Sequence, residues 1–351
     1  MVSNAELAEA LFLLAESHPP GELRLALLRA AYTVFDQPRE IERSRRLPES
    51  IPLDVLPTVT MLRTCTSADA LLAAVQRLGG PLRPRRSGTR SGFLTAAEVH
   101  TVLAEDGALN PSHLRGAAHF HTRASDGAGT LEGMAHACLR RGYSWAVISD
   151  HTRGLACVNG LDAEGVAIQA RAVAAWNRRR GEDLWLAQGL EVEVLEDGRL
   201  DIPRGDRENV LVIAAVHTEL AERGDQTRRL LRALDEPGVW ALGHPQGRLF
   251  GRRGGIRANW ELVFRRAAER GVLLEVNGFP RRQDLDVTLL SLARQTGCRF
   301  LLASDAHHPR HLVFDATAAA IATRARVPQS AIVNFGSLDG MLAERPDRDS
   351  R

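Results

Sequence analysis

The sequence predicts an α/β protein: a closed (β/α)7 barrel of seven parallel strands and their helices, preceded by a small, mostly helical domain. Short apolar runs typical of strands alternate with helical patterns from about residue 117 onward. The ends of these runs recur at steps near the roughly 30 residues of one strand–helix–strand unit. Each run ends in His, Asp, Glu or Asn, and seven such ends can meet at one mouth only if the sheet closes into a barrel.

The clearest strand end is the apolar run Phe300–Ala303, which is followed by Asp305 and His307. Such a run is typical of a buried parallel strand. Near a strand terminus, residues i and i+2 point the same way, so we expect this carboxylate and imidazole to face one cavity. Six further runs end in the same manner, at His119 and His121, Asp150 and His151, Glu191 and Glu193, His217, His244, and Glu275 and Asn277.

Taken singly, each of these polar residues has an ordinary structural interpretation. A lone histidine at a strand end is usually hydrogen-bonded to its surroundings, and an aspartate after a strand usually caps a helix. Seven repetitions make coincidence a poor explanation, and six of the twelve histidines lie at these ends. We therefore interpret the set as converging metal-ligand types.

Helical patterns fill the gaps between the strand-like runs, over residues 131–141, 162–180, 225–234, 259–270 and 285–296. The Asp197-Gly198 pair predicts a hairpin turn, which would form a small excursion after the third strand.

The N-terminal part predicts a separate helical domain over residues 1–110, with the barrel over 111–351. Ser3 and Glu6 have the spacing of a capping box before an apolar-periodic segment. Further helices are expected at about 21–35, 67–78 and 95–103, and residues 38–54 as a linker or a short helix. Residues 79–92 are rich in Gly, Pro and Arg and could be a solvated connector or a loop that contacts phosphate; we favour the connector.

Composition limits the possible partners. The chain has 351 residues and a net charge of +2, and all of its basic residues are arginines. No overall positive charge favours nucleic acid, so any attraction for phosphate must be local. Four cysteines without paired spacing argue against disulfides and thiolate zinc sites and for a reducing, cytoplasmic environment. Neither a signal peptide nor a membrane-spanning apolar run is present in the sequence, so no membrane partner is expected.

The strand-end motifs together resemble one family. HFHTRASDG, ISDHT, GLEVEV, AAVH, GHPQGRL, EVNGFPRR and SDAHH, within residues 114–336, are similar to the successive motifs of the PHP (polymerase and histidinol phosphatase) family. The similarity is greatest to the PHP domain of bacterial family X DNA polymerases. It implies a TIM-like barrel, a trinuclear metal centre and phosphoesterase activity. The metal ligands that it implies are His119, His121, Asp126, His151, Glu191, His217, His244, Asp305 and His307.

The chain departs from the family pattern in three places. Ala117-Ala118 stand where the family has Asp-Leu before the first histidine, which affects local support and no ligand. Some 110 N-terminal residues are too few for a polymerase domain. The stretch 56–72 contains no glycine, where related short proteins carry a glycine-rich hairpin that binds DNA phosphates. This weakens the case for DNA binding through that hairpin.

The residue types agree with metal-assisted hydrolysis. Six imidazoles with three carboxylates suit Zn²⁺, Mn²⁺ or Fe²⁺ better than Mg²⁺, and we expect three such ions per chain. Clustered divalent ions activate water and balance the charge of a phosphate. We assign the catalytic work to Asp305, His307, His151 and Arg248. Arg248 follows the fifth strand and could be either a phosphate contact or surface charge.

The expected function is hydrolysis of phosphate esters at nucleic-acid ends, as a 3′-5′ exonuclease or a 3′-phosphatase in DNA repair. One alternative is a small-molecule phosphatase of the histidinol-phosphate type. Another, of a different class, is a metal-stabilised binding or accessory factor in DNA repair. Turnover of a chromogenic phosphate ester would separate the enzymes from the accessory factor.

Overall fold

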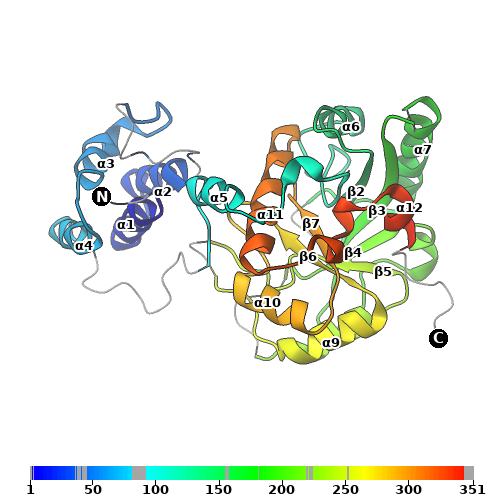
Figure 1. The fold of residues 1–351 in the computed structure, drawn as a ribbon. Helices are drawn as coiled ribbons and strands as arrows, with labels where there is room; N and C mark the ends of the chain where they lie inside the picture. The colour runs from blue at the N-terminus through cyan, green and yellow to red at the C-terminus, as the bar shows by residue number, and fades with distance from the viewer. Residues whose placement is uncertain are drawn as a thin grey trace. The chain divides into compact units, whose positions relative to one another are not determined.

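The computed structural model describes residues 2, 4–35, 37, 41, 46–80, 92–154, 158–180, 182–218, 220, 224–250 and 253–343. The chain divides into two compact units, which are described separately below (Figure 1). One unit comprises Met1–Glu105 with Phe250–Arg252, and the other comprises Asp106–Leu249 with Arg253–Arg351.

The larger unit is built on a sheet of seven parallel strands that neighbour one another in chain order. A parallel bridge between Phe120 and Ala306 joins the first strand's segment to the last, which closes the barrel. The (β/α)7 prediction is therefore confirmed. The strands are β1 Gly116–Ala117, β2 Trp145–His151, β3 Trp185–Glu193, β4 Leu211–Ala215, β5 Val239–Leu242, β6 Leu273–Asn277 and β7 Phe300–Ala303.

The strands are apolar on both faces because both faces are covered. Every residue of β2, β4, β5, β6 and β7 is buried. Trp145, Ile213, Trp240 and Leu301 belong to the core within the barrel. Burial on both sides explains why these strands read as continuous Val, Ile, Leu and Ala runs.

Helices surround the strands, as the ribbon shows (Figure 1). The five predicted helical ranges are confirmed to within two residues at their ends, and α11 and α12 were not predicted. Asn259 and Asp286 accept hydrogen bonds from the first turns of α9 and α10, as N-caps do. The helices are α6 Leu131–Arg140, α7 Ala163–Arg180, α8 Thr227–Asp235, α9 Trp260–Arg270, α10 Val287–Gln295, α11 Asp315–Arg324 and α12 Leu338–Ala343.

Two local predictions have different outcomes. The Asp197-Gly198 turn is confirmed, since Val194 and Leu200 form an antiparallel bridge and Gly198 has φ 86°. The first strand, expected to end at about His121, contains only Gly116–Ala117. It ends early because the backbone of His119 is left-handed, with φ 55°.

The smaller unit is helical, as predicted. Its core contains apolar residues of α1 to α4 and takes in Phe250. Thr95 and Glu98 form a capping box at the start of α5, whereas Ser3 of the predicted first capping box and residues 81–91 of the connector lie outside the described residues. The helices are α1 Asn4–Ser17, α2 Glu22–Phe35, α3 Leu56–Leu62, α4 Ala68–Arg77 and α5 Ala96–Leu103, with a 3₁₀ turn η2 at Leu53–Val55.

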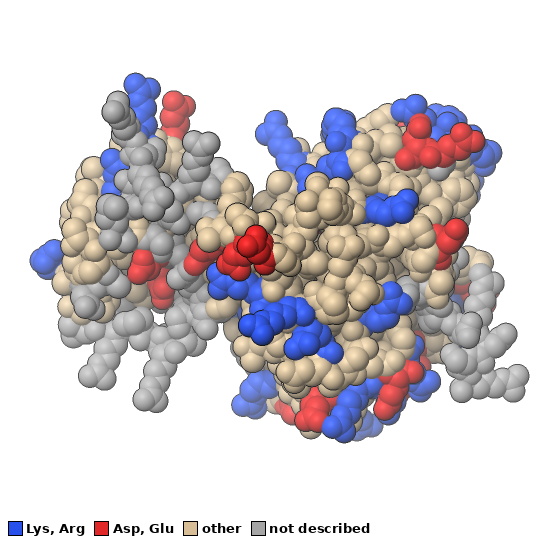
Figure 2. Space-filling model, in the orientation of Figure 1, with Lys and Arg blue, Asp and Glu red and all other residues tan. Residues whose placement is uncertain are grey.

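The charged side chains, the cysteines and the apolar helices can each be compared with the predictions from composition. Arginines and acidic side chains are interspersed on the face drawn in Figure 2. Cys65, Cys138 and Cys298 are free, and Cys157 lies outside the described residues. Among the helices of the described chain, none combines the length and the apolar character needed to cross a membrane.

Candidate metal centre

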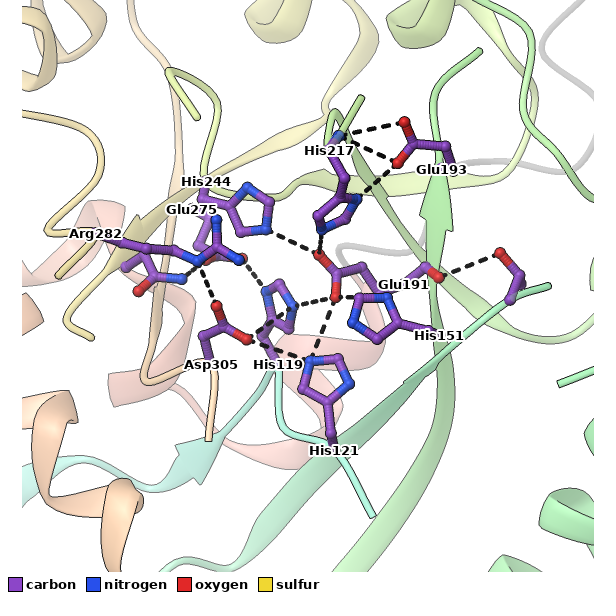
Figure 3. A network of polar contacts seen from close by, with 12 residues as sticks. His119, His121, His151, Glu191, Glu193, His217, His244, Glu275, Arg282 and Asp305 are labelled. Carbon is purple, nitrogen blue, oxygen red and sulfur yellow. Dashed lines mark hydrogen bonds and ion pairs between the residues drawn. The ribbon is translucent and has the colours of Figure 1, made fainter. Parts of the chain in front are cut away.

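Glu191, near the end of β3, is surrounded by histidine rings (Figure 3). Its carboxylate is buried, and it lies within 3.3 Å of ring nitrogens of five histidines. They come from the ends of four strands, because His119 and His121 both follow β1. The distances are 3.0 Å for His119, 3.3 Å for His121, 3.3 Å for His151, 3.1 Å for His217 and 2.9 Å for His244.

The backbone is left-handed at three residues that follow strands and belong to the predicted ligand set. His119, His244 and Asp305 have φ values of 55°, 25° and 47°, a region that residues other than glycine seldom occupy. Each such residue costs on the order of 1–3 kcal/mol and persists only where its surroundings enforce it. The left-handed residues end the strands and turn their own side chains toward Glu191 and its neighbours (Figure 3).

A more exposed group lies beside this buried cluster. Asp126 and His307 are 3.2 Å apart, and Asp126 lies 3.7 Å from ring nitrogens of both His121 and His151. The side chains of Asp126 and His307 are 28% and 32% exposed, whereas that of Glu191 is 1% exposed. This is the side from which solvent reaches the cluster.

The structure thus brings together all nine residues of the predicted ligand set, and eight of them form three overlapping groups that could each hold an ion. His244 is not in these groups but contacts Glu191 directly. The role of these nine residues as metal ligands stays a prediction. The inner group is His119, His121, Glu191 and Asp305; the outer group is His121, Asp126, His151 and His307; the third group is His151, Glu191 and His217.

Buried polar atoms without hydrogen bonds indicate that the residues fit a metal. Nε2 of His119, both ring nitrogens of His121, and Nε2 of His217 are buried and have no hydrogen-bond partner. Oε2 of Glu191 is also buried without a hydrogen-bond partner, although ring nitrogens lie within 3.3 Å of it. Unsatisfied buried groups of this kind are costly, and cations coordinated by them would remove that cost. The donor set, imidazole with carboxylate, suits transition metals.

The electrostatics of the cluster favour positive charge. Burial lowers the pKa of His121 and His217, but neighbouring carboxylates outweigh burial and raise both pKa values to about 9. These carboxylates are Asp305 and Glu191 for His121, and Glu191 and Glu193 for His217. Burial raises the pKa of Asp126, but His307 and His121 outweigh burial and lower this pKa to about 2. Asp126 is therefore ionised near neutral pH. A divalent cation would provide this positive charge without protonating the rings.

Burial has the opposite effect on two other rings. It lowers the pKa of His244 to about 4, with the Arg282 guanidinium adding to the effect. It also lowers the pKa of His151 to about 4, against the pull of Glu191. Both rings are therefore neutral at physiological pH, which is the form in which imidazole coordinates a metal.

Several supporting residues fall outside the predicted set. Oε2 of Glu193 lies 2.7 Å from Nδ1 of His217, and Oε2 of Glu275 is hydrogen-bonded to Nδ1 of His119. Arg282 donates a hydrogen bond through Nε to Oδ2 of Asp305 at 2.6 Å. The two glutamates stood at strand ends in the sequence, which was a usable signal. Arg282 had none beyond its place in a loop after β6.

Asp150 and Arg248 lie beside the predicted ligand set. Asp150, which precedes His151 at the end of β2, accepts hydrogen bonds from the backbone N–H of Thr122 at 2.7 Å and from Oγ of Ser125 at 2.7 Å, which orders the segment carrying Asp126. Arg248 is buried, with Nη1 3.5 Å from Asp286 and its backbone N–H 3.2 Å from Asp284. The arginine that the structure places on a predicted ligand is Arg282, and a phosphate contact by Arg248 stays a prediction.

Proteins with a similar sequence include a DNA polymerase/exonuclease and a probable phosphatase. No family model matches the chain. The chain is 33% identical over 213 residues to the DNA polymerase/3′-5′ exonuclease PolX of Bacillus subtilis. The aligned region covers 60% of this chain and 37% of that protein. It is 25% identical over 201 residues to a probable phosphatase of Caldicellulosiruptor saccharolyticus, covering 54% of this chain and 78% of that protein.

Among solved structures, the chain is similar to histidinol phosphate phosphatase of Lactococcus lactis, complexed with zinc, L-histidinol and phosphate. The identity is 15% and the TM-score 0.42, covering 60% of this chain and 92% of that one. A putative histidinol phosphatase of Listeria monocytogenes is also similar in structure, with 12% sequence identity and a TM-score of 0.44. The similarity covers 56% of this chain and 97% of that one. The seven motifs, the seven-stranded barrel and the sequence similarity over 213 residues agree with the resemblance of this chain to the PHP family.

Proposed function

We propose that this protein is a hydrolase of phosphate esters that depends on divalent transition metals. The observation that carries the proposal is the buried Glu191 carboxylate with five imidazoles within 3.3 Å of it. A structural histidine cluster would satisfy its ring nitrogens internally, whereas Nε2 of His119, His121 and His217 have no hydrogen-bond partner. Such a set of open donors is suited to binding cations.

The nine predicted ligands would hold about three ions of Zn²⁺, Mn²⁺ or Fe²⁺. When bound, such ions supply an activated water and a positive field for phosphate. The protein's own residues supply the geometry. Arg282 fixes one oxygen of Asp305, and Asp150 orders the segment that carries Asp126. The deep location of Glu191 keeps water from the inner group, while the partly exposed Asp126 and His307 leave a side open to substrate.

The favoured substrate is a nucleic-acid end, cleaved as a 3′-5′ exonuclease or a 3′-phosphatase. The similarity to the polymerase and exonuclease of Bacillus subtilis supports this proposal, although the chain spans only 37% of that protein. A small phosphate monoester, of the histidinol-phosphate type, is the second candidate. This second candidate is supported by the similarity to a probable phosphatase, in which the aligned region covers 78% of that protein.

One assay panel tests both candidates. Single-stranded DNA, 3′-phosphorylated DNA and histidinol phosphate would each be incubated with the protein and Mn²⁺ or Zn²⁺. We expect metal-dependent hydrolysis, fastest on one of the DNA substrates. Faster turnover of histidinol phosphate would reverse the order of the candidates.

The control for this panel is Glu191→Gln, which keeps the shape of the side chain but removes the charge shared by five imidazoles. This variant should lose hydrolysis of every substrate. If the wild-type protein binds metals but turns over none of the three substrates or a chromogenic phosphate ester, the proposal fails and the protein is a metal-stabilised binding factor.

A further inference from the structure

Two glutamates outside the predicted ligand set contact histidines on the ring nitrogen that faces away from Glu191. Oε2 of Glu193 lies 2.7 Å from Nδ1 of His217, and Nε2 of the same ring lies 3.1 Å from Oε1 of Glu191. Glu275 contacts Nδ1 of His119, whose Nε2 lies 3.0 Å from Oε2 of Glu191. Figure 3 shows both pairs, each with the ring between its glutamate and the centre.

The other contacts of Glu193 hold its carboxylate in this orientation. It accepts hydrogen bonds from the backbone N–H of His217 at 3.1 Å, from the backbone N–H of Thr218 at 3.1 Å and from Oγ1 of Thr218 at 2.8 Å. Arg229 lies 3.7 Å away. With its oxygens engaged by these donors, Glu193 is directed at the outer side of the His217 ring and away from the predicted ions.

Glu275 is fixed in a comparable manner. Its side chain is buried, and its Oε1 accepts a hydrogen bond from Nδ2 of Asn277 at 2.6 Å, which leaves Oε2 for His119. Both glutamates come from strands, β3 and β6, so rigid backbone positions them.

We propose that Glu193 and Glu275 are positioning residues that set the tautomer of His217 and His119. A carboxylate is an acceptor, so Nδ1 of each ring carries the proton and donates it, and the lone pair of a neutral ring is then on Nε2. Nε2 is the nitrogen that faces Glu191 and the centre in both rings. A fixed tautomer and orientation strengthens a histidine as a metal ligand.

The other rings provide a contrast. Nδ1 of His244 is buried without a hydrogen-bond partner, and Nδ1 of His307 lies 2.9 Å from the backbone oxygen of Asp305. Neither has a glutamate on that nitrogen in the described part of the chain. Loss of a carboxylate partner should therefore weaken the ions next to His119 and His217 and leave the outer group unaffected.

The test measures metal binding and does not depend on substrate. Glu193→Gln and Glu275→Gln would each be titrated with Zn²⁺ in competition with a fluorescent chelator, and retained zinc counted by elemental analysis. We expect about a 10- to 100-fold loss of affinity for one ion per chain in each variant. Glu236→Gln is the matched control, because this glutamate pairs with Arg207 at 2.7 Å away from the centre, and it should bind Zn²⁺ like the wild type.

A second readout reports the tautomer directly. In the zinc-loaded protein with labelled histidine, the ¹⁵N signals of His119 and His217 should show a proton on Nδ1, and the signal of the affected ring should shift in each variant. If the buried Glu275→Gln variant does not fold, Glu275→Asp, which keeps the charge but is one methylene shorter, replaces it and should show an intermediate loss.

The inference rests on the proposed metal centre, and the two can fail separately. A wild-type protein that binds no Zn²⁺ would overturn the metal centre. Folded glutamate variants that bind Zn²⁺ as tightly as the wild type, with unchanged ring signals, would overturn only the positioning role.

Discussion

Arg282 donates a hydrogen bond through Nε to Oδ2 of Asp305 at 2.6 Å, while Oδ1 of Asp305 lies 3.2 Å from Nε2 of His121. One oxygen of this carboxylate is thus engaged by a guanidinium and the other faces the cluster. Burial opposes the charge on Asp305, but Arg282 is the strongest of the neighbours that hold its pKa well below the usual range. The loops after β6 and β7 are joined at this contact.

Replacing Arg282 should therefore impair the centre without touching a predicted ligand. In Arg282→Ala the Asp305 carboxylate is free to turn, and we expect kcat at saturating Mn²⁺ to fall on the order of 10- to 100-fold. Arg282→Lys keeps the charge but lacks the planar fork of donors and should recover part of the loss. Steady-state kinetics on a chromogenic phosphodiester check this. Wild-type kcat in the alanine variant would show that Asp305 does not need the contact.

Arg248→Ala tests the prediction that this arginine grips phosphate. A lost phosphate contact should raise KM for the physiological substrate more than it lowers kcat. The structure offers a competing explanation, because Nη1 of Arg248 lies 3.5 Å from Asp286 and the Arg248 side chain is 4% exposed. Unchanged KM together with a lowered melting temperature would show that Arg248 joins two loops and does not bind substrate.

A buried carboxylate away from the centre predicts a pH dependence of stability. Asp315 accepts a hydrogen bond from Oη of Tyr143 at 2.6 Å, and burial raises the pKa of Asp315 to about 6. Because the folded state keeps this proton more tightly than the unfolded state, the contribution to stability is present at pH 4 and is lost as the pH rises through about 6.

Asp315→Asn is uncharged at every pH and should lack this loss. Between pH 4 and pH 7, the difference in unfolding free energy between the variant and the wild type should move in favour of the variant by on the order of 1–3 kcal/mol. Urea unfolding in excess chelator at both pH values measures it. A difference that does not change with pH would mean that Asp315 titrates normally in the folded protein.

The barrel could be predicted from sequence because its physical causes are local. Buried parallel strands need continuous apolar runs, and the polar residue that ends each run, such as His217 or His244, is visible without knowledge of the fold. Closure followed from the need for seven ends to meet, and the Phe120–Ala306 bridge bears it out. By contrast, α11 is rich in alanine and has only a weak apolar periodicity, so the sequence pattern did not reveal it.

The support of the centre could not be predicted in the same way. Whether Arg248 or Arg282 reaches a ligand depends on the paths of two loops, and arginine is frequent throughout the chain. The left-handed backbone of His119 and Asp305 has no sequence signal, because the surrounding structure and not the residue type enforces it. The domain boundary near residue 110 remains a prediction.

The most direct test of the account is the metal content of the purified protein, measured by elemental analysis. The five imidazoles around Glu191 and the three groups of ligand-type side chains predict about two to three transition-metal ions per chain. Adding Mn²⁺ or Zn²⁺ to stripped protein should raise its melting temperature, since an ion that binds the folded state stabilises it. Protein that contains no metal and gains no thermal stability from either ion would contradict the account.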